Sequence, residues 1–166
     1  NAKWSKDLVK PGDKVELSVE TTGIDSGEKI SFFIWQREIG KADLQVENFE
    51  VQIQGDKAKT EWQVPGADSK ENSSGYSCQD YYFTVLSNPD LTARSGTLYI
   101  EDFIEIELKD EDGKAIANEE YVLYLPNGEV RKGKLDGSGS RKEEKVPRGS
   151  YSIAFPNLAR FKKDQG

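Results

Sequence analysis

The chain has 166 residues, a formal net charge of −7 and a sequence pI of about 4.8. An acidic surface repels phosphate groups, so we expect no binding to nucleic acid and no docking on anionic lipid. Apolar stretches such as residues 32–35 are far shorter than the roughly 20 residues of a membrane-spanning helix, so we expect no membrane insertion. With no His and one Cys, the sequence lacks the commonest general base, the commonest zinc ligand and any internal disulfide.

Composition also bears on domain organisation. Hydrophobic residues make up 35% of the chain and charged residues 32%. This balance suits two thin modules, each with much surface per unit of core, better than one deep core. Because the sequence contains no Met, we expect it to be a fragment of a longer protein or a processed form.

Apolar and polar residues alternate through most of the first hundred positions, which is the pattern of half-buried β-strands. Clusters of Gly, Asp, Asn, Ser and Pro separate the predicted strands, which centre on residues 15–19, 30–35, 49–53, 58–64, 81–85 and 98–100. Residues 39–47 have room for one short helical turn at most. Residues 66–75, rich in Ser, Asp, Glu and Asn, are predicted to form a mobile loop.

A second set of strands begins near Asp102. The first of them places Ile104, Ile106 and Leu108 on one face, and the others are predicted at residues 121–125, 130–135 and 151–155. The Asn127–Gly128 pair indicates a hairpin turn with left-handed backbone. No Gly or Pro interrupts residues 98–103, so a short, stiff joint is expected near Glu101–Asp102.

These patterns predict an all-β chain of two antiparallel β-sandwich modules in tandem. The predicted modules are residues 1–101 and 102–158, followed by a charged tail, residues 159–166, that is expected to fray.

The first predicted module resembles bacterial immunoglobulin-like domains. Residues 10–19 are similar to the Pro-Gly-Asp opening of such domains, and Trp35 resembles the buried tryptophan of their core. The partner cysteine of the second strand is missing, because Leu17 and Val19 stand in that region. Residues 75–78 resemble a tyrosine corner only superficially, and we interpret this likeness as chance.

The second predicted module resembles transthyretin-like modules, relatives of carboxypeptidase regulatory domains and of collagen-adhesin B repeats. The likeness rests on the spacing of turns and strands in residues 108–118, 121–123, 135–139 and 146–151. Residues 151–158 are most similar to the modules found beside type VI secretion spike and cargo proteins. This resemblance implies a secreted, cell-surface or periplasm-facing bacterial protein, and a role as a spacer or adaptor.

Three classes of function remain open. The first is a non-catalytic structural, adaptor or protein-binding module of a bacterial secretion-spike or surface protein. The second is a carbohydrate- or peptidoglycan-binding accessory module of a cell-wall protein, and an enzyme is the least favoured. A row of aromatic side chains on one sheet favours the second class, free strand edges favour the first, and a pocket lined by perturbed carboxylates favours the third.

No catalytic residue, metal site or cofactor is predicted. Cys78 has no His to activate it, and the nearby carboxylate of Asp80 is expected to disfavour the reactive thiolate form. An EF-hand that starts at Asp110 would need Gly at its sixth position and Glu at its twelfth, which are Ala115 and Tyr121. A looser calcium site with Asp136 stays open, although an acidic turn is the simpler interpretation.

Binding residues are sought among exposed aromatic side chains and loops. Trp35 and Trp62 fall in apolar alternation and are assigned to the core, whereas Trp4 and Tyr82 are predicted to be exposed binding residues. Asn127, in the hairpin of residues 126–128, is the third candidate, and residues 66–75 are a candidate contact loop. A Lys–Asn isopeptide crosslink is not expected, because no Lys faces inward on the first strand of the second module.

Overall fold

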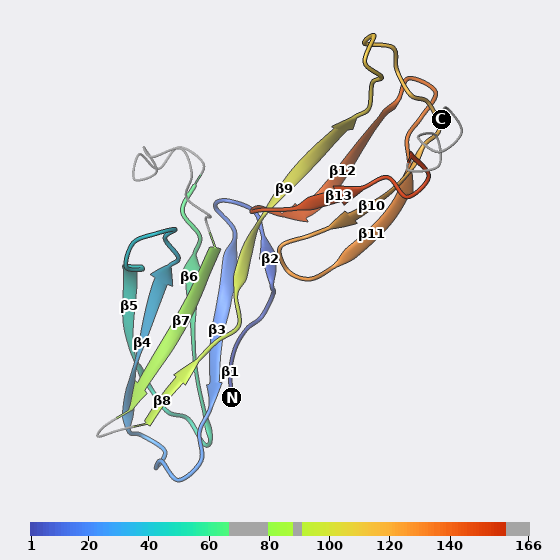
Figure 1. Ribbon diagram of the computed structural model, residues 1–166. Coiled ribbons are helices and arrows are strands. Elements are labelled where there is room, and N and C mark those ends of the chain that lie inside the picture. The colour runs from blue at the N-terminus through green and yellow to red at the C-terminus, as the bar shows by residue number, and fades with distance from the viewer. Residues whose placement is uncertain (67–79, 88–90, 159–166) are drawn as a thin grey trace. The chain divides into compact units, whose positions relative to one another are not determined.

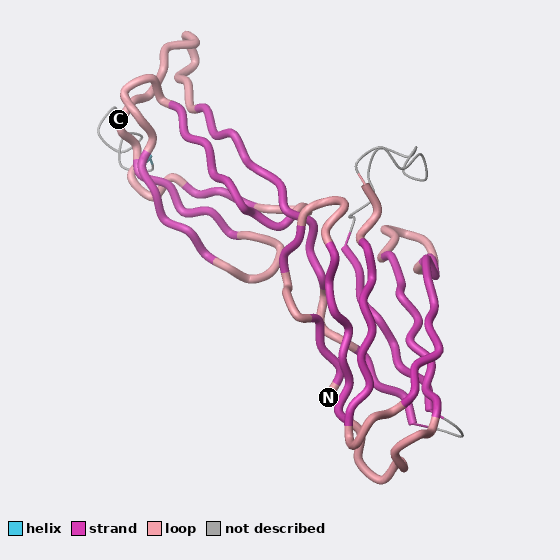
Figure 2. Tube along the Cα trace, turned by 180° about the vertical axis from the view of Figure 1, so that it is seen from behind, coloured by secondary structure: helices cyan, strands magenta, loops and turns pink. Residues whose placement is uncertain are grey.

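The computed structural model describes residues 1–66, 80–87 and 91–158 (Figure 1). Every element of this part of the chain is a β-strand, as the tube in Figure 2 shows, so the predicted all-β class is confirmed. The chain divides into two compact units, Asn1–Glu101 and Asp102–Gly166, here called unit 1 and unit 2. Three features named above lie outside the described residues, namely most of the 66–75 loop, Cys78 with its neighbours, and the 159–166 tail.

Unit 1 is built from two sheets. One sheet has the strand order β1-β3-β6, and in the other β7 and β4 pair with each other and lead to β5 at the edge. β7 also pairs with β8 and with the start of β9, and β2 joins β9 in parallel. The strands are β1 (Ala2–Trp4), β2 (Leu8–Val9), β3 (Lys14–Glu20), β4 (Lys29–Gln36), β5 (Leu44–Gln52), β6 (Lys57–Gln63), β7 (Asp80–Ser87), β8 (Leu91–Arg94) and β9 (Leu98–Glu107).

One apolar cluster joins the two sheets of unit 1. Alternate residues of β3, such as Leu17, face Phe32 of β4 and Phe83 of β7, and all three side chains are fully buried. Trp62 belongs to this cluster, as predicted. The alternation read from the sequence therefore identifies the inward residues of most strands of unit 1.

One expectation for unit 1, the assignment of Trp35 to the core, is wrong. Trp35 is half-buried and lies on the face of β4 opposite Phe32 and Ile34, because neighbouring residues of a strand point to opposite faces. Residues 39–41 form a turn and a bend and the chain enters β5 at Leu44, so the 39–47 segment, which had room for one short helical turn, contains no helix.

Unit 2 is smaller and has its own apolar cluster. Its strands are the second half of β9, β10 (Glu120–Tyr124), β11 (Val130–Lys134), β12 (Ser140–Pro147) and β13 (Ser152–Ala154). β10 lies between β11 and β13, and β12 pairs with β9. Ile104 and Ile106 face inward as predicted, and they pack with Tyr121, Leu123 and Leu135.

The hairpin between β10 and β11 differs from the prediction in one respect. Gly128 alone takes the left-handed conformation, with φ of 87°, and Asn127 does not. The Asn127 side chain instead accepts a hydrogen bond from the Glu129 backbone N–H at 3.0 Å. Asn127 therefore closes the turn through its side chain rather than through a left-handed backbone.

Candidate binding face

A group of aromatic and polar side chains lies on the face of the β4–β7 sheet that points away from the core. The register pairs Phe33 with Thr84 and Trp35 with Tyr82, and Thr84 pairs in turn with Arg94 of β8. These five side chains share one side of neighbouring strands. They are called the aromatic face below.

Trp35 is held in one orientation on this face. Its indole Nε1 donates a hydrogen bond to Thr84 Oγ1 at 2.9 Å. Its ring lies nearly parallel to the ring of Tyr82, with an interplanar angle of 14° and ring centroids 6.4 Å apart. An indole fixed from two sides loses little rotamer freedom when a ligand binds over it.

Tyr82 was predicted to be exposed, but it is 8% exposed. Its ring does point to the outer side of the sheet, where other groups cover it. The Arg94 guanidinium lies 3.8 Å from the centroid of the ring, and the Tyr82 hydroxyl donates to Asp43 Oδ2 at 2.7 Å. Tyr82 is therefore a covered member of the aromatic face and does not present its ring to solvent.

The pKa values of Tyr82 and of its hydrogen-bond partner Asp43 shift in opposite directions. Burial, and then the hydrogen bond to Asp43, raise the pKa of Tyr82. That same hydrogen bond, together with one from the Glu38 backbone N–H, lowers the pKa of the Asp43 carboxyl. Asp43 is thus held as an anion by two donors, which anchors the 37–43 loop to the sheet.

Asp80, at the start of β7, is a second carboxylate in this region. Its side chain is 9% exposed, and burial raises its pKa, opposed by Arg37, whose Nη1 lies 3.5 Å from Asp80 Oδ2. Its other oxygen, Oδ1, is buried with no hydrogen-bond partner in the described part of the chain. Two carboxylates with opposite pKa shifts are typical of acid–base sites, but neither lies in either of the hollows described next.

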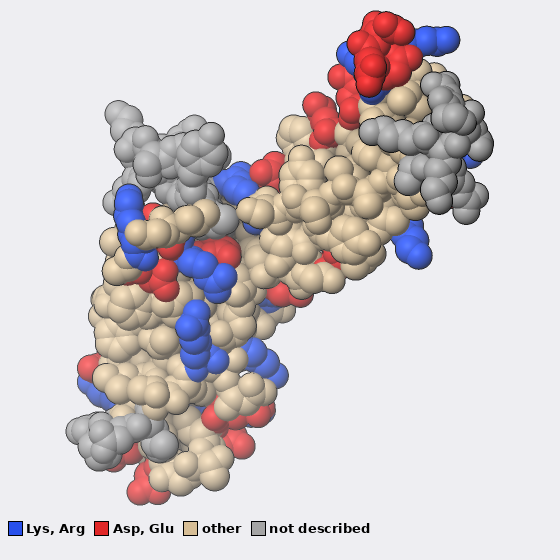
Figure 3. All heavy atoms as spheres, viewed as in Figure 1, with Lys and Arg blue, Asp and Glu red and all other residues tan. Residues whose placement is uncertain are grey.

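Two surface hollows of unit 1 differ in character. The larger, of about 740 Å³, is lined by charged residues that pair with one another, such as Lys57 with Glu20 at 3.6 Å and Lys59 with Glu16 at 3.4 Å. The smaller, of about 240 Å³, is mainly apolar and lies between the end of β3 and β8. Figure 3 shows Lys and Arg side chains along the middle of the side of unit 1 that carries β4, β7 and β8.

The other two predicted binding residues lie elsewhere. Trp4 is half-buried and packs edge-on against Phe83, with ring centroids 4.8 Å apart, and its Nε1 donates to the Gly96 carbonyl at 3.1 Å. Trp4 therefore belongs to the rim of the core, on the side of β7 away from Tyr82. Asn127 is exposed in unit 2, where its side chain closes the hairpin.

Sequence reasoning missed Trp35 as a candidate. The signal was present, because Ser31, Phe33 and Trp35 alternate with the inward residues of β4. The apolar alternation of β4 and the resemblance to an immunoglobulin core together assigned this tryptophan to the wrong face. The sequence around Arg94 and Asp43 does not indicate their contacts with Tyr82, because folding alone brings these distant positions together.

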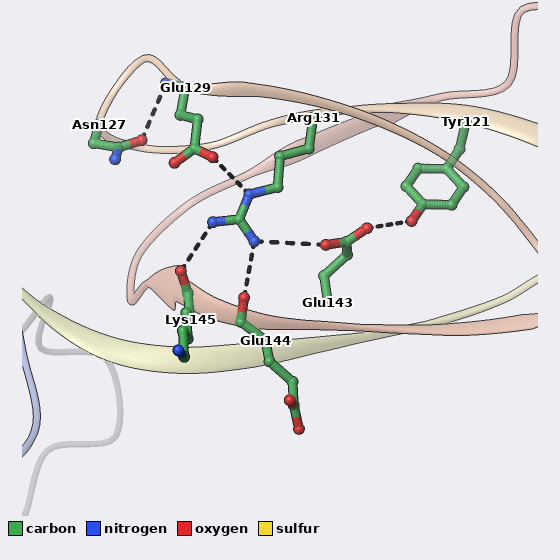
Figure 4. Close-up of polar contacts among 7 residues, drawn as sticks. All are labelled: Tyr121, Asn127, Glu129, Arg131, Glu143, Glu144 and Lys145. Atoms are coloured by element: carbon green, nitrogen blue, oxygen red, sulfur yellow. Dashed lines mark hydrogen bonds and ion pairs between the residues drawn. The ribbon is translucent and has the colours of Figure 1, made fainter.

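Unit 2 holds a polar network centred on Arg131 (Figure 4). Arg131 Nε donates to Glu129 Oε1 at 2.7 Å, and its two terminal nitrogens donate to the carbonyls of Glu144 and Lys145 at 2.8 and 2.9 Å. Lys145 has a positive φ of 54°, which is unusual for a residue other than Gly. The guanidinium thus holds an irregular stretch of β12 in place, and its donors are committed to the fold.

Tyr121 joins this network from β10. Its hydroxyl donates to the Glu143 carboxylate, which also accepts from Arg131 at 3.5 Å. Burial, and then Glu143, raise the pKa of Tyr121 to about 12. Because these bonds tie β10, β11 and β12 to one another, we interpret the network as structural.

The described residues contain no group of three or more His, Cys, Asp or Glu that could hold a metal ion. Asp110 Oδ1 accepts from the backbone N–H groups of Asp112 and Lys114, and Asp136 Oδ1 accepts from those of Ser138 and Ser140. Hydrogen bonds, first of all from the Ser138 side chain, lower the pKa of Asp136. Both acidic turns are therefore closed by their own carboxylates.

In the described part of the chain, no helix is long and apolar enough to cross a membrane. No protein-family model matches the chain, and none of the curated proteins matches it.

Proposed function

We propose that the chain is a non-catalytic binding module, a structural or adaptor piece of a larger bacterial secretion-spike or surface protein, and that unit 1 contacts a protein partner through the aromatic face. The observation that carries this proposal is the immobilised Trp35 on the outer side of a sheet, with Tyr82 and Arg94 beside it. Trp, Tyr and Arg are the side chains most enriched among residues that dominate protein–protein binding energy.

A role without catalysis is supported by the chemistry of the site. The sequence has no His, and the Asp43 carboxylate is already held by the Tyr82 hydroxyl and the Glu38 backbone. The likeness to immunoglobulin-like and transthyretin-like modules supports the setting, a protein secreted or displayed by a bacterium.

Carbohydrate binding is the second candidate, and the orientation of Trp35 favours it. A fixed indole offers an apolar plane on which the C–H face of a sugar ring can stack. Asn48 of β5, next to Phe33 in the register, adds an amide on the same side of the sheet. The ligand expected from this arrangement is a cell-wall glycan.

The test compares Trp35→Ala with Leu86→Ala. Leu86 is 45% exposed and lies on the same side of the sheet, so its removal is a matched loss of apolar surface. Binding is measured by cross-linking mass spectrometry against cell-envelope proteins and by pull-down on purified peptidoglycan, with circular dichroism to check folding. We expect Trp35→Ala to weaken binding at least about tenfold, equivalent to about 1.4 kcal/mol, and Leu86→Ala to change it by less than about threefold.

Three results would contradict the proposal. Equal binding by both variants would mean that the aromatic face is not the contact surface. Retention on peptidoglycan alone would favour the second candidate. Turnover of a glycan or peptide panel by the pure protein would reveal an enzyme.

A further inference from the structure

β5 forms an edge of the larger sheet of unit 1. It spans Leu44–Gln52, and within the described residues β4 is its one strand neighbour. All of its residues are exposed or half-buried. A long edge strand presents unpaired backbone N–H and C=O groups, which are a template for another strand.

The hydrogen-bond pattern shows which backbone groups point to this free edge. Ile53, directly after β5, points its backbone groups to the β4 side, because its N–H donates to Glu28 O and its C=O accepts from Gly27 N, both at 2.8 Å and both just before β4. Direction alternates along an antiparallel strand, so Val51 and Phe49 also face β4, and Asn48, Glu50 and Gln52 face outward. The Asn48 N–H agrees with this, because it donates to the Glu47 side chain at 3.0 Å instead of to β4.

We propose that β5 pairs with β5 of a second copy of this chain, antiparallel, with a two-fold axis at Phe49. This register places Asn48 opposite Glu50 of the second copy, so that outward-facing groups meet outward-facing groups. Phe49 then lies opposite its own counterpart, and Val51 lies opposite Glu47 of the second copy. Such an interface is isologous and closes at a dimer.

The sequence of β5 favours pairing with a second copy of the chain in this register. A two-fold axis at Glu50 would set two carboxylates directly opposite each other, which is destabilising. An axis at Asn48 would bring Glu50 against Val46, where the register of β4 and β5 shifts. The axis at Phe49 puts no carboxylates opposite each other, pairs an amide with each Glu50, and brings two aromatic rings together. Lys29 already contacts Glu50 and offsets its charge.

The dimer should be weak. Pairing through residues 47–51 buries well under the roughly 1,000 Å² of a stable interface, so it is expected at high protein concentration or when the chains are tethered. An antiparallel pair of this kind continues the sheet, which puts the aromatic faces of both copies on one side. Two copies would then bind a repetitive partner with higher avidity. The pairing itself does not depend on the proposed function.

Cysteine trapping tests the register directly, in a Cys78→Ser background so that the introduced thiol has no competitor. Cα atoms of a directly opposed pair without mutual hydrogen bonds lie about 4.5 Å apart, within the range that a disulfide spans. We expect Phe49→Cys to form a covalent dimer under mild oxidation. Val51→Cys is the matched control and should not, because its opposite residue is Glu47.

A second pair of variants covers the case in which Phe49→Cys disturbs the core against which Phe49 packs. Glu47→Cys and Val51→Cys should each stay monomeric alone and form a disulfide when mixed. Asn48→Pro removes an outward N–H and leaves the bonds to β4 intact, so it should lower self-association in sedimentation velocity at concentrations up to about 1 mM.

The proposal is overturned if the wild type sediments as a monomer throughout, if no cysteine pair cross-links, or if Val51→Cys cross-links as readily as Phe49→Cys. These outcomes are independent of whether Trp35→Ala loses its partner.

Discussion

Replacing Gly133 by Ala is expected to destabilise unit 2 strongly. Gly133 of β11 lies opposite Tyr121 of β10, and the Tyr121 ring crosses the space that a Cβ would fill. The added methyl carbon would overlap the phenol oxygen and would lie 2.9 Å from Cε1 of the ring. Tyr121 is 1% exposed, so the ring has no free space to enter.

The size of the effect follows from two costs. Forcing an extra methyl group into a packed core costs about 1–3 kcal/mol. Moving the phenol also breaks its hydrogen bond to the Glu143 carboxylate, and a bond to a charged group contributes about 1.5–3 kcal/mol. Ala regains at most about 1 kcal/mol of backbone entropy. The expected net loss is about 1.5–5 kcal/mol, a large part of the stability of a small domain.

The measurement is amide hydrogen exchange in peptides from β10 and β11, supported by circular dichroism in denaturant. All three Trp residues of the chain lie in unit 1, so Trp fluorescence does not report on unit 2. Gly137→Ala is the matched control, because its Cβ would meet nothing within 4 Å and its φ is ordinary. Its effect should stay below about 0.5 kcal/mol.

The reasoning is refuted if the two Ala variants have the same stability. A double-mutant cycle adds a second check. Once Tyr121→Ala has removed the ring, Gly133→Ala should cost little.

Three further predictions concern pH and modularity. Because the pKa of Tyr121 is raised from 10.0 to about 12, its contribution to folding is present below pH 10 and lost as pH rises through 12. Ultraviolet titration should therefore show a tyrosine that ionises near pH 12 and that Tyr121→Phe removes, separate from Tyr82, whose pKa is also raised. Because the pKa of Asp43 is lowered from 3.8, its contribution to folding stability is present above pH 3.8 and is lost as pH falls below it. The melting temperatures of wild type and Asp43→Asn should therefore converge in acid. A difference in melting temperature that stays constant with pH would disprove the assignment. Residues 103–158 expressed alone should give a dispersed β-type NMR spectrum, whereas a collapsed spectrum would mean that the halves share a core.

Removal of metal is a separate expectation. Because His is absent and the acidic turns at Asp110 and Asp136 are closed by their own carboxylates, a chelator should leave the melting temperature unchanged. A reversible drop of several degrees that calcium restores would reveal a site that this reasoning missed.

Much of the fold could be predicted because strand alternation is a local property. Ile104 and Ile106 are separated by exposed Glu105, and this pattern alone places both in the core of unit 2. The same holds for Val15, Leu17 and Val19 in unit 1. Such strands have one apolar side, so their inward residues can be read without knowing what packs against them.

What the sequence by itself determined was the all-β class, the inward residues of one-sided strands and the absence of His-dependent chemistry. The inward side of β4 was decided only by the tertiary structure, because Phe32 and Ile34 on one side and Phe33 and Trp35 on the other are equally apolar. Pairing with β5 and β7 and packing against β3 selected the first pair. The cover over Tyr82 was likewise decided by the fold, since Asp43 reaches it from 39 positions away. The alternation of apolar and polar residues describes each strand by itself. Contacts between distant segments, such as that of Asp43 with Tyr82, form only when the strands have paired in their final register.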